Sequence, residues 1–132
     1  PAPITTDLAA PPPAATDLVG VPARITDGDT LRLAGRRVRL AGIDAPELST
    51  PEGERARRHL VAIAQGRTLR CADTGERSYD RVVARCYGPD GRDLAEVMVE
   101  AGWAYDLPHF SNGRYRPAQR RAAQARRGLH AG

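Results

Sequence analysis

The stretch ITDGDTLRLAGRRVRLAGIDAPE, residues 25–47, decides the fold because a strand pattern in it gives way to a charged turn. Leu31 and Leu33 alternate with polar residues, and Val38 and Leu40 do the same after a glycine. A period of two is typical of strands with one buried face, and a glycine between two such runs is typical of a tight turn. The stretch therefore predicts a hairpin that leads into a turn.

The same stretch carries charge on its other face. Because successive side chains of a strand point to opposite faces, Arg37 and Arg39 must point away from the core. The segment RLAGIDAPE then places Arg39 shortly before two carboxylates, those of Asp44 and Glu47, with a proline between them. A proline pushes the residue before it towards extended backbone and so stiffens this turn.

The rest of the chain completes an α+β fold that is mainly β. Further patterns predict a helix over 54–65, strands over 67–71 and 82–87, a helix from the N-cap Asp93 to Gly102, a loop over 104–116, and a helix from Pro117 through Leu129. With the strands of residues 19–40, this order suits a small, partly open, five-stranded barrel better than a sandwich or a doubly wound sheet.

The length of 132 residues fits one domain with its own core. Residues 1–18 are rich in proline and alanine and lack apolar periodicity, so we expect a flexible segment there and a folded domain over 19–132. The sequence starts at Pro1 without a methionine, and such a spacer often follows a signal peptide or an anchor. Export is therefore expected, although no apolar run of the sequence could span a bilayer.

The net charge is +4, and every cationic residue is an arginine. Arginine pairs with phosphate through two parallel hydrogen bonds, but a GC-rich genome also produces this bias. The charge therefore permits a polyanionic partner without establishing one.

The two cysteines, Cys71 and Cys86, lie at the ends of an expected hairpin. A bridge between them would stabilise the fold by about 3 kcal/mol on the chain-entropy estimate. The alternative is a pair of thiols in a reducing compartment, and we favour the bridge. Without further cysteine or histidine partners, they make a weak zinc site.

Several motifs together resemble those of the thermonuclease (staphylococcal nuclease-like) family. The matching segments are ITDGDTLRL, VRLAGIDAPE, YDRVVARCY, LAEVMVEAGWA and AQRRAAQARRGL, and the resemblance runs in order over residues 19–130. It implies a Greek-key OB-fold barrel with three helices. It also implies a calcium-dependent endonuclease, acting as a monomer on single-stranded DNA and RNA and leaving 5′-hydroxyl and 3′-phosphate ends.

The resemblance also implies roles for individual residues. The metal ligands would be Asp29, Asp44 and the backbone carbonyl of Ala45; the catalytic residues Arg39, Glu47 and Arg81; and the nucleotide contacts Tyr79 and Tyr115. The chemistry agrees, because calcium prefers oxygen ligands and arginines stabilise the charge of a phosphodiester under attack. Glu47 would accept a proton from the attacking water.

One segment departs from the family pattern. Where the family usually has Asp-x-Tyr-Gly-Arg, this chain reads RSYDR, residues 77–81. Asp80 stands in the glycine position, where aspartate tolerates a left-handed backbone better than most residues. Its charge could pair with Arg81 and weaken activity, and Ser78 replaces a common lysine.

Plainer interpretations remain open for each motif. The DGD sequence alone is a common turn, Asp44 and Glu47 could pair with Arg39 on the surface, and Tyr115 could be a loop tyrosine that covers the barrel. For the whole chain, one alternative is a non-catalytic OB module that binds single strands or a protein partner. Another is a domain for a different polyanion, such as an acidic polysaccharide.

Overall fold

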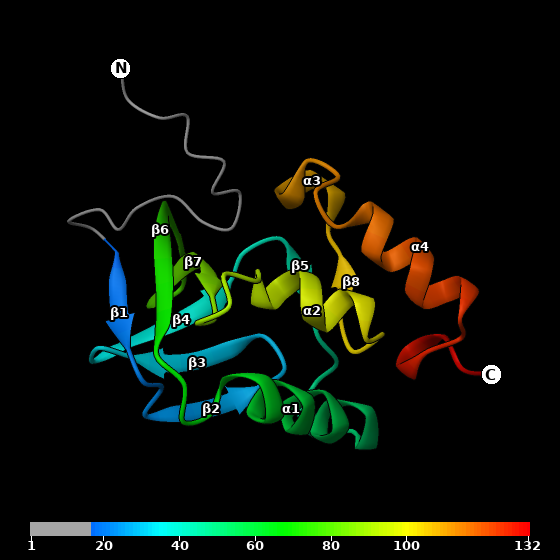
Figure 1. The fold of residues 1–132 in the computed structure, drawn as a ribbon, viewed down its shortest axis with the longest axis horizontal. Coiled ribbons are helices and arrows are strands. Elements are labelled where there is room, and N and C mark those ends of the chain that lie inside the picture. Colours follow the sequence, from blue (N-terminus) through cyan, green and yellow to red (C-terminus); the bar gives the residue numbers. More distant parts are fainter. Residues whose placement is uncertain (1–16) are drawn as a thin grey trace.

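The computed structural model describes residues 17–132, and most of the predicted flexible segment lies outside this range (Figure 1). The strands are β1 Leu18–Gly20, β2 Arg24–Asp27, β3 Thr30–Leu33, β4 Arg36–Leu40, β5 Ile43–Asp44, β6 Leu69–Ser78, β7 Arg81–Tyr87 and β8 Tyr105–Asp106. The helices are α1 Pro51–Ala64, α2 Leu94–Glu100, α3 Pro108–Ser111 and α4 Arg116–Gln124, followed by a 3-10 turn, η1 Gly128–His130.

Six strands form one mixed sheet in the order β1-β6-β7-β4-β3-β2, and β5 pairs with β8 in a second, two-stranded sheet. The neighbours in the larger sheet are antiparallel except for β4 and β7, which are parallel. The predicted hairpin is present as β3 and β4, joined by Ala34 and Gly35, both with positive φ. Positive φ at both loop residues is what a two-residue hairpin turn of the favoured type requires.

The α+β class agrees with the prediction, and the strand order is compatible with an OB-like fold. Among residues 17–132, β1 and β2 are the two ends of the strand order, so a closed barrel stays a prediction. The expected five strands correspond to β2, β3, β4, β6 and β7, and β1 adds a short edge strand beside β6.

Helix boundaries differ from the prediction in two places. α1 begins at Pro51 and not at residue 54, because the Thr50 side chain accepts a hydrogen bond from the Gly53 amide and caps the helix. α4 ends at Gln124, five residues earlier than expected, because Arg126 has a φ of 54° that no α-helix contains. The expected loop over 104–116 also holds the short elements β8 and α3.

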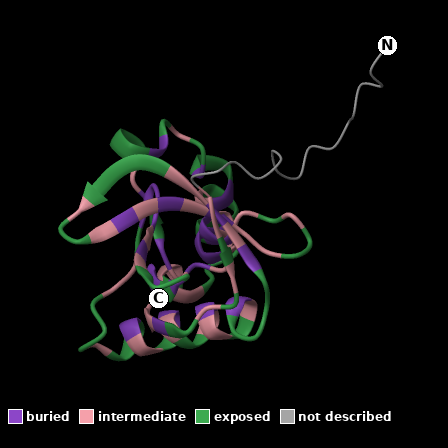
Figure 2. Cartoon of the chain, turned by 90° about the vertical axis from the view of Figure 1, so that its left-hand side faces the viewer, coloured by how far each residue is buried: buried purple, intermediate pink, exposed green. Residues whose placement is uncertain are grey.

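The core lies between the larger sheet and the helices. Figure 2 shows buried residues gathered in the interior, whereas the long hairpin of β6 and β7 ends in exposed residues. Fully buried side chains come from both layers: Leu31, Leu33, Val38, Leu40, Ile43, Leu60, Leu69, Val82, Met98 and Val99. This core fixes the outward direction of the residues that alternate with its strands.

The hairpin of β6 and β7 is crosslinked by a disulfide between Cys71 and Cys86, which are directly opposite in the register. Both cysteines are fully buried. At the start of the described chain, Asp17 lies 3.7 Å from Arg70 of β6, so the last two residues of the predicted flexible segment, Asp17 and Leu18, contact the sheet. Between residues 17 and 132, the structure contains no helix with the length and apolarity to cross a membrane.

Candidate active site

The predicted residues come from four places: the turn before β3, strand β4, the segment after β5, and the start of β7. The turn before β3 begins with Asp27, whose side chain accepts a hydrogen bond from the Asp29 amide at 3.0 Å. Asp29 in turn accepts from the Thr30 hydroxyl at 3.1 Å and from the Ala45 amide at 3.0 Å. The Asp29 carboxylate therefore ties the β2–β3 turn to the segment after β5.

Arg39 joins the two proposed calcium ligands. Its Nη2 atom lies 3.6 Å from Asp29 Oδ2 and also 3.6 Å from Asp44 Oδ1, while Nη1 donates to the Leu40 carbonyl at 3.0 Å. The Arg39 side chain is only 17% exposed, whereas that of Asp44 is 60% exposed. One guanidinium thus lies between two carboxylates, and one of these remains open to solvent.

Arg81 reaches the same cluster from β7. Its Nη1 donates to the Thr30 hydroxyl at 3.0 Å, and that hydroxyl donates to Asp29. Arg81 forms no ion pair with Asp80, as the sequence had suggested it could, because Asp80 pairs with Arg37 at 2.6 Å instead. The left-handed residue of the hairpin tip is Tyr79, with a φ of 59°, and not Asp80 as expected. Arg81 is therefore directed at the site despite the unusual RSYDR sequence.

Glu47 lies in a backbone turn that α1 holds in place. The Glu47 carbonyl accepts hydrogen bonds from the Thr50 amide at 3.0 Å and the Thr50 hydroxyl at 2.7 Å. Gly53 packs so closely that a Cβ there would lie 1.8 Å from the same carbonyl oxygen. Only glycine allows this approach.

Negative charge crowds the site. Burial, together with a hydrogen bond and charge repulsion from Asp29, raises the pKa of Asp27 to about 6. Partial burial, and then the charges of Asp29 and Glu47, raise the pKa of Asp44, although Arg39 opposes this. The repulsion indicates that Glu47 and Asp29 both lie near Asp44, and a cation would relieve it.

The donor set fits a hard cation only in part. Within the described residues, no three His, Cys, Asp or Glu side chains are grouped so as to hold a metal ion. The predicted set has two aspartates and a backbone carbonyl, so water and substrate oxygens would have to complete a calcium shell. Asp29 and Asp44 do converge, since both are within 3.6 Å of one Arg39 nitrogen.

The two predicted nucleotide-contacting tyrosines differ completely in exposure. Tyr79 is 95% exposed at the hairpin tip and is free to stack on a base. Tyr115 is 1% exposed, and its hydroxyl donates to Asp93 at 2.6 Å. Tyr115 therefore packs in the core, which agrees with the alternative interpretation of a tyrosine that covers the barrel. The expected nucleotide contact is wrong for this residue.

Sequence reasoning missed two residues of the site. Thr30 links Asp29 to Arg81 through hydrogen bonds. Its place in the site follows only from the strand register, in which Thr30 is opposite Arg39. Tyr105 is opposite Asp44 in the β5–β8 pair and is 42% exposed. No short-range signal in the sequence could have identified Tyr105, because β5 and β8 are far apart along the chain.

The fold and the site define a class: an α+β domain in which arginines and carboxylates from separate strands form one partly buried cluster that opens to solvent at Asp44. The comparisons with known proteins identify the family. Residues 37–131 match the family described as "Staphylococcal nuclease homologue", and the chain belongs to this family.

Several proteins of known sequence are similar to this chain over most of its length. The chain is 34% identical over 120 residues to "Succinoglycan biosynthesis protein ExoI" of Rhizobium meliloti (strain 1021), which covers 83% of this chain and 62% of that protein. It is 30% identical over 118 residues to an "Uncharacterized endonuclease" of Escherichia coli, covering 86% of this chain and 77% of the relative. It is also 36% identical over 107 residues to the "Micrococcal nuclease" of Shigella flexneri, and this match covers 70% of this chain and 62% of that protein.

Proposed function

We propose that this protein is a calcium-dependent endonuclease that hydrolyses phosphodiester bonds of single-stranded DNA and RNA on an OB-fold scaffold. One observation carries the proposal: Arg39 lies between Asp29 and Asp44, and Arg81 reaches the same Asp29 through Thr30. Two guanidiniums and two carboxylates thus form one connected cluster, in which Asp44 is open to solvent. The family and the endonuclease and nuclease names of its relatives support the same activity.

Each residue has a role in this proposal. Asp29, Asp44 and the Ala45 carbonyl would hold calcium, which when bound supplies positive charge next to the scissile phosphate. Arg39 and Arg81 would bind the equatorial oxygens, where negative charge grows during attack. These side chains come from different strands, so the sheet fixes their spacing before the substrate arrives.

Glu47 would act as the general base. It removes a proton from a water molecule, whose oxygen attacks phosphorus while the bond to the 5′ oxygen breaks. The leaving oxygen takes a proton, from Arg39, Arg81 or solvent, and the products are a 5′-hydroxyl and a 3′-phosphate. The turn that α1 holds would keep Glu47 within reach of that water.

Tyr79 would provide a stacking surface beside the site. Its side chain is 95% exposed, and its positive φ is unusual for a bulky residue. Such local strain is typical of functional positions and supports a stacking role. Stacking on an aromatic ring tolerates any base, which agrees with an enzyme of low sequence preference.

The buried disulfide supports a location outside the reducing cytosol, so we further propose that the protein is exported and acts there as a monomer. The two alternatives from the sequence are less well supported. A non-catalytic OB module, or a domain for an acidic polysaccharide, would have no need for Glu47 held between Asp44 and the start of α1.

Digestion of heat-denatured DNA tests the proposal. With millimolar calcium, the DNA should be cut to short fragments that end in 3′-phosphates, and a chelator should abolish the cutting. Native duplex DNA should be cut more slowly, and RNA at a rate similar to that of denatured DNA. Binding of denatured DNA without calcium-dependent cleavage would favour the non-catalytic module, and cleavage of a polysaccharide alone would favour the other alternative.

A further inference from the structure

Three arginines lie side by side on neighbouring strands next to the site. Arg24 of β2 is opposite Arg32 of β3, and Arg32 is opposite Arg37 of β4. In the parallel pair of β4 and β7, Arg37 and Arg81 each come one residue before the first paired residues, so they lie beside each other. We call Arg24, Arg32 and Arg37 the arginine row, and it leads across the sheet from the proposed catalytic residue Arg81.

The arginine row is on the same face of the sheet as the site. Directly opposite residues of a strand pair point to the same side, and so do residues two apart in one strand. Arg32 is two residues from Thr30, and Arg37 is two residues from Arg39. Since each residue of a strand advances by about 3.3 Å, the row lies roughly 7 Å from the Thr30–Arg39 pair.

The charges of the row are only partly compensated. Arg24 and Arg32 are exposed, and neither forms an ion pair with any residue between 17 and 132, whereas Arg37 pairs with Asp80. Like charges directly opposite in a sheet destabilise it, so Arg24 and Arg32 cost stability unless an anion lies between them. A phosphate is such an anion, and arginine binds it with two parallel hydrogen bonds.

We propose that Arg24 and Arg32 bind backbone phosphates of the single-stranded substrate on one side of the scissile phosphate. This inference rests on the proposed nuclease function and deepens it, because it makes a polymer of several nucleotides the preferred substrate. Phosphate contacts carry no base information, so the row holds the strand in position without selecting a sequence.

The test compares the parent protein with the double variant R24Q/R32Q on two substrates. One is a twelve-nucleotide DNA oligomer, and the other is a dinucleotide, whose single phosphodiester cannot reach the row. The variant should raise the ratio of KM for the oligomer to KM for the dinucleotide about tenfold, since two charge-assisted contacts are lost. Oligomer binding, measured by fluorescence anisotropy in chelator, should show a log–log salt slope smaller by about 1.4, because each phosphate contact on a single strand contributes about 0.7.

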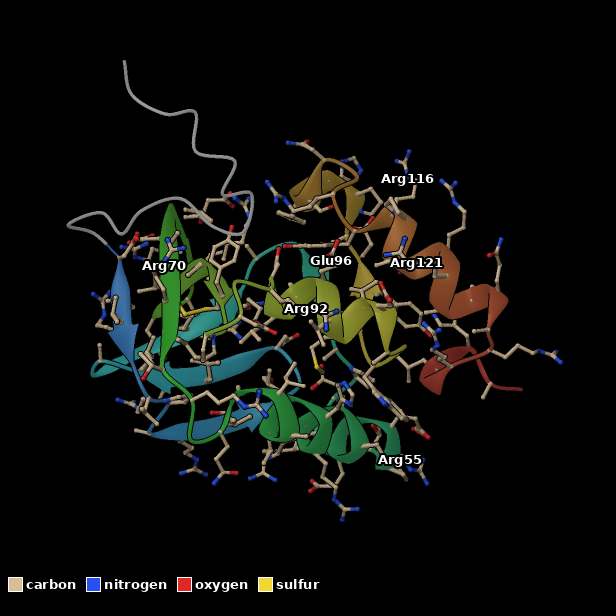
Figure 3. All side chains as sticks on the ribbon, in the orientation of Figure 1. Arg55, Arg70, Arg92, Glu96, Arg116 and Arg121 are labelled. Carbon is tan, nitrogen blue, oxygen red and sulfur yellow. A yellow bond between two sulfur atoms is a disulfide. The ribbon has the colours of Figure 1, made fainter. Side chains whose placement is uncertain are left out.

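The matched control is R116Q/R120Q, which removes the same charge from exposed arginines of α4. Figure 3 shows Arg116 at the start of this helix, far from the strands of the row in Figure 1. The control should keep the parent's KM ratio and salt slope. If R24Q/R32Q behaves like the control, or if it impairs both substrates equally, the arginine row is not a binding site for flanking phosphates.

The binding measurement also separates this inference from the proposed function. If the parent cuts no substrate with calcium, the nuclease proposal fails, yet the salt slope in chelator can still be compared among the three proteins. A smaller slope for R24Q/R32Q alone then supports the row as a single-strand binding surface. An unchanged slope overturns it, whatever the activity.

Discussion

Two groups of polar residues in this molecule are built in opposite ways. In the first, Arg39 lies 3.6 Å from both Asp29 and Asp44, a separation longer than a hydrogen bond. In the second, the Tyr115 hydroxyl donates to Asp93 at 2.6 Å, and Asp93 also accepts from the Ala95 amide at 2.9 Å as the N-cap of α2. The first group leaves the Asp44 carboxylate open to a ligand, whereas the second uses its charge internally.

The difference indicates which polar group is functional. A structural carboxylate is satisfied by nearby donors and capped helices, because an unsatisfied buried charge is costly. The site instead keeps several carboxylates close enough to repel one another, with Asp44 largely open to solvent. That arrangement is expensive for the free protein and favourable once a cation and a phosphate bind.

The largest effect should come from Glu47→Gln. The amide keeps the size of the side chain but cannot accept the proton of water, so kcat on denatured DNA should fall by about 10³, within the range of general base catalysis. The measurement is kcat under saturating calcium, with thermal unfolding as a check that the fold is intact. A variant as fast as the parent would remove Glu47 from the mechanism.

The next effect should come from Gly53→Ala, which changes the support of Glu47 and no proposed reacting group. The added Cβ would collide with the Glu47 carbonyl and shift the turn, so we expect kcat to fall by about 100-fold. The control is Glu52→Ala, an exposed position in the same helical turn, which should keep the parent's kcat. Equal activity of both variants would show that α1 does not position Glu47.

A smaller effect is expected in the structural group, from Tyr115→Phe. Removing a hydrogen bond to a carboxylate should lower the free energy of unfolding by about 2 kcal/mol at neutral pH. Tyr115→Phe should leave kcat near the parent value, because the tyrosine is buried in the core and is not accessible to a substrate. A large loss of activity with unchanged stability would instead place Tyr115 in the site.

The pH dependence of this variant sharpens the comparison. Burial raises the pKa of Asp93, so its contribution to stability is fully present below the pKa of the unfolded chain and is lost as pH rises through the folded pKa. The Tyr115 hydrogen bond opposes this by stabilising the carboxylate. Urea unfolding should therefore show a larger cost of Tyr115→Phe at pH 7 than at pH 4, and an equal cost at both would argue against an ionised Asp93.

The smallest effect is expected from Asp80→Asn. Because Asp80 pairs with Arg37 on the surface and not with Arg81, its loss should leave kcat close to that of the parent. It should free Arg37 and lower KM for long single strands by about twofold, since exposed ion pairs are weak. A tenfold rise in kcat would show instead that Asp80 restrains Arg81 in solution.

The sequence predicted those features that depend on local pattern. Alternating leucines and valines gave the β3–β4 hairpin, and Asp93 was correctly expected to cap α2. Features that depend on long-range pairing were not accessible. The buried Tyr115 donates a hydrogen bond to Asp93, 22 residues away, and the pairing of Asp80 with Arg37 spans 43 residues.

The candidate site shows the same difference between features of local pattern and features of long-range pairing. Motif order was enough to propose Asp29, Arg39, Asp44 and Arg81 together, but Thr30 as the link between Asp29 and Arg81 required the register of three strands. The end of α4 was also missed, because the alanine spacing continues past Gln124 while the backbone turns at Arg126.

The direction of Arg81 depends on the register of its strand. The register of β6 and β7 shifts between Asp73 and Arg77, so the inner and outer parts of this hairpin pair in different registers. A slide by one residue would turn every side chain of β7 to the opposite face and carry Arg81 into the core. The covalent link between Cys71 and Cys86 holds the register of the inner part of this hairpin, and the pairing of Val82 with Val38 of β4 holds the strand next to Arg81.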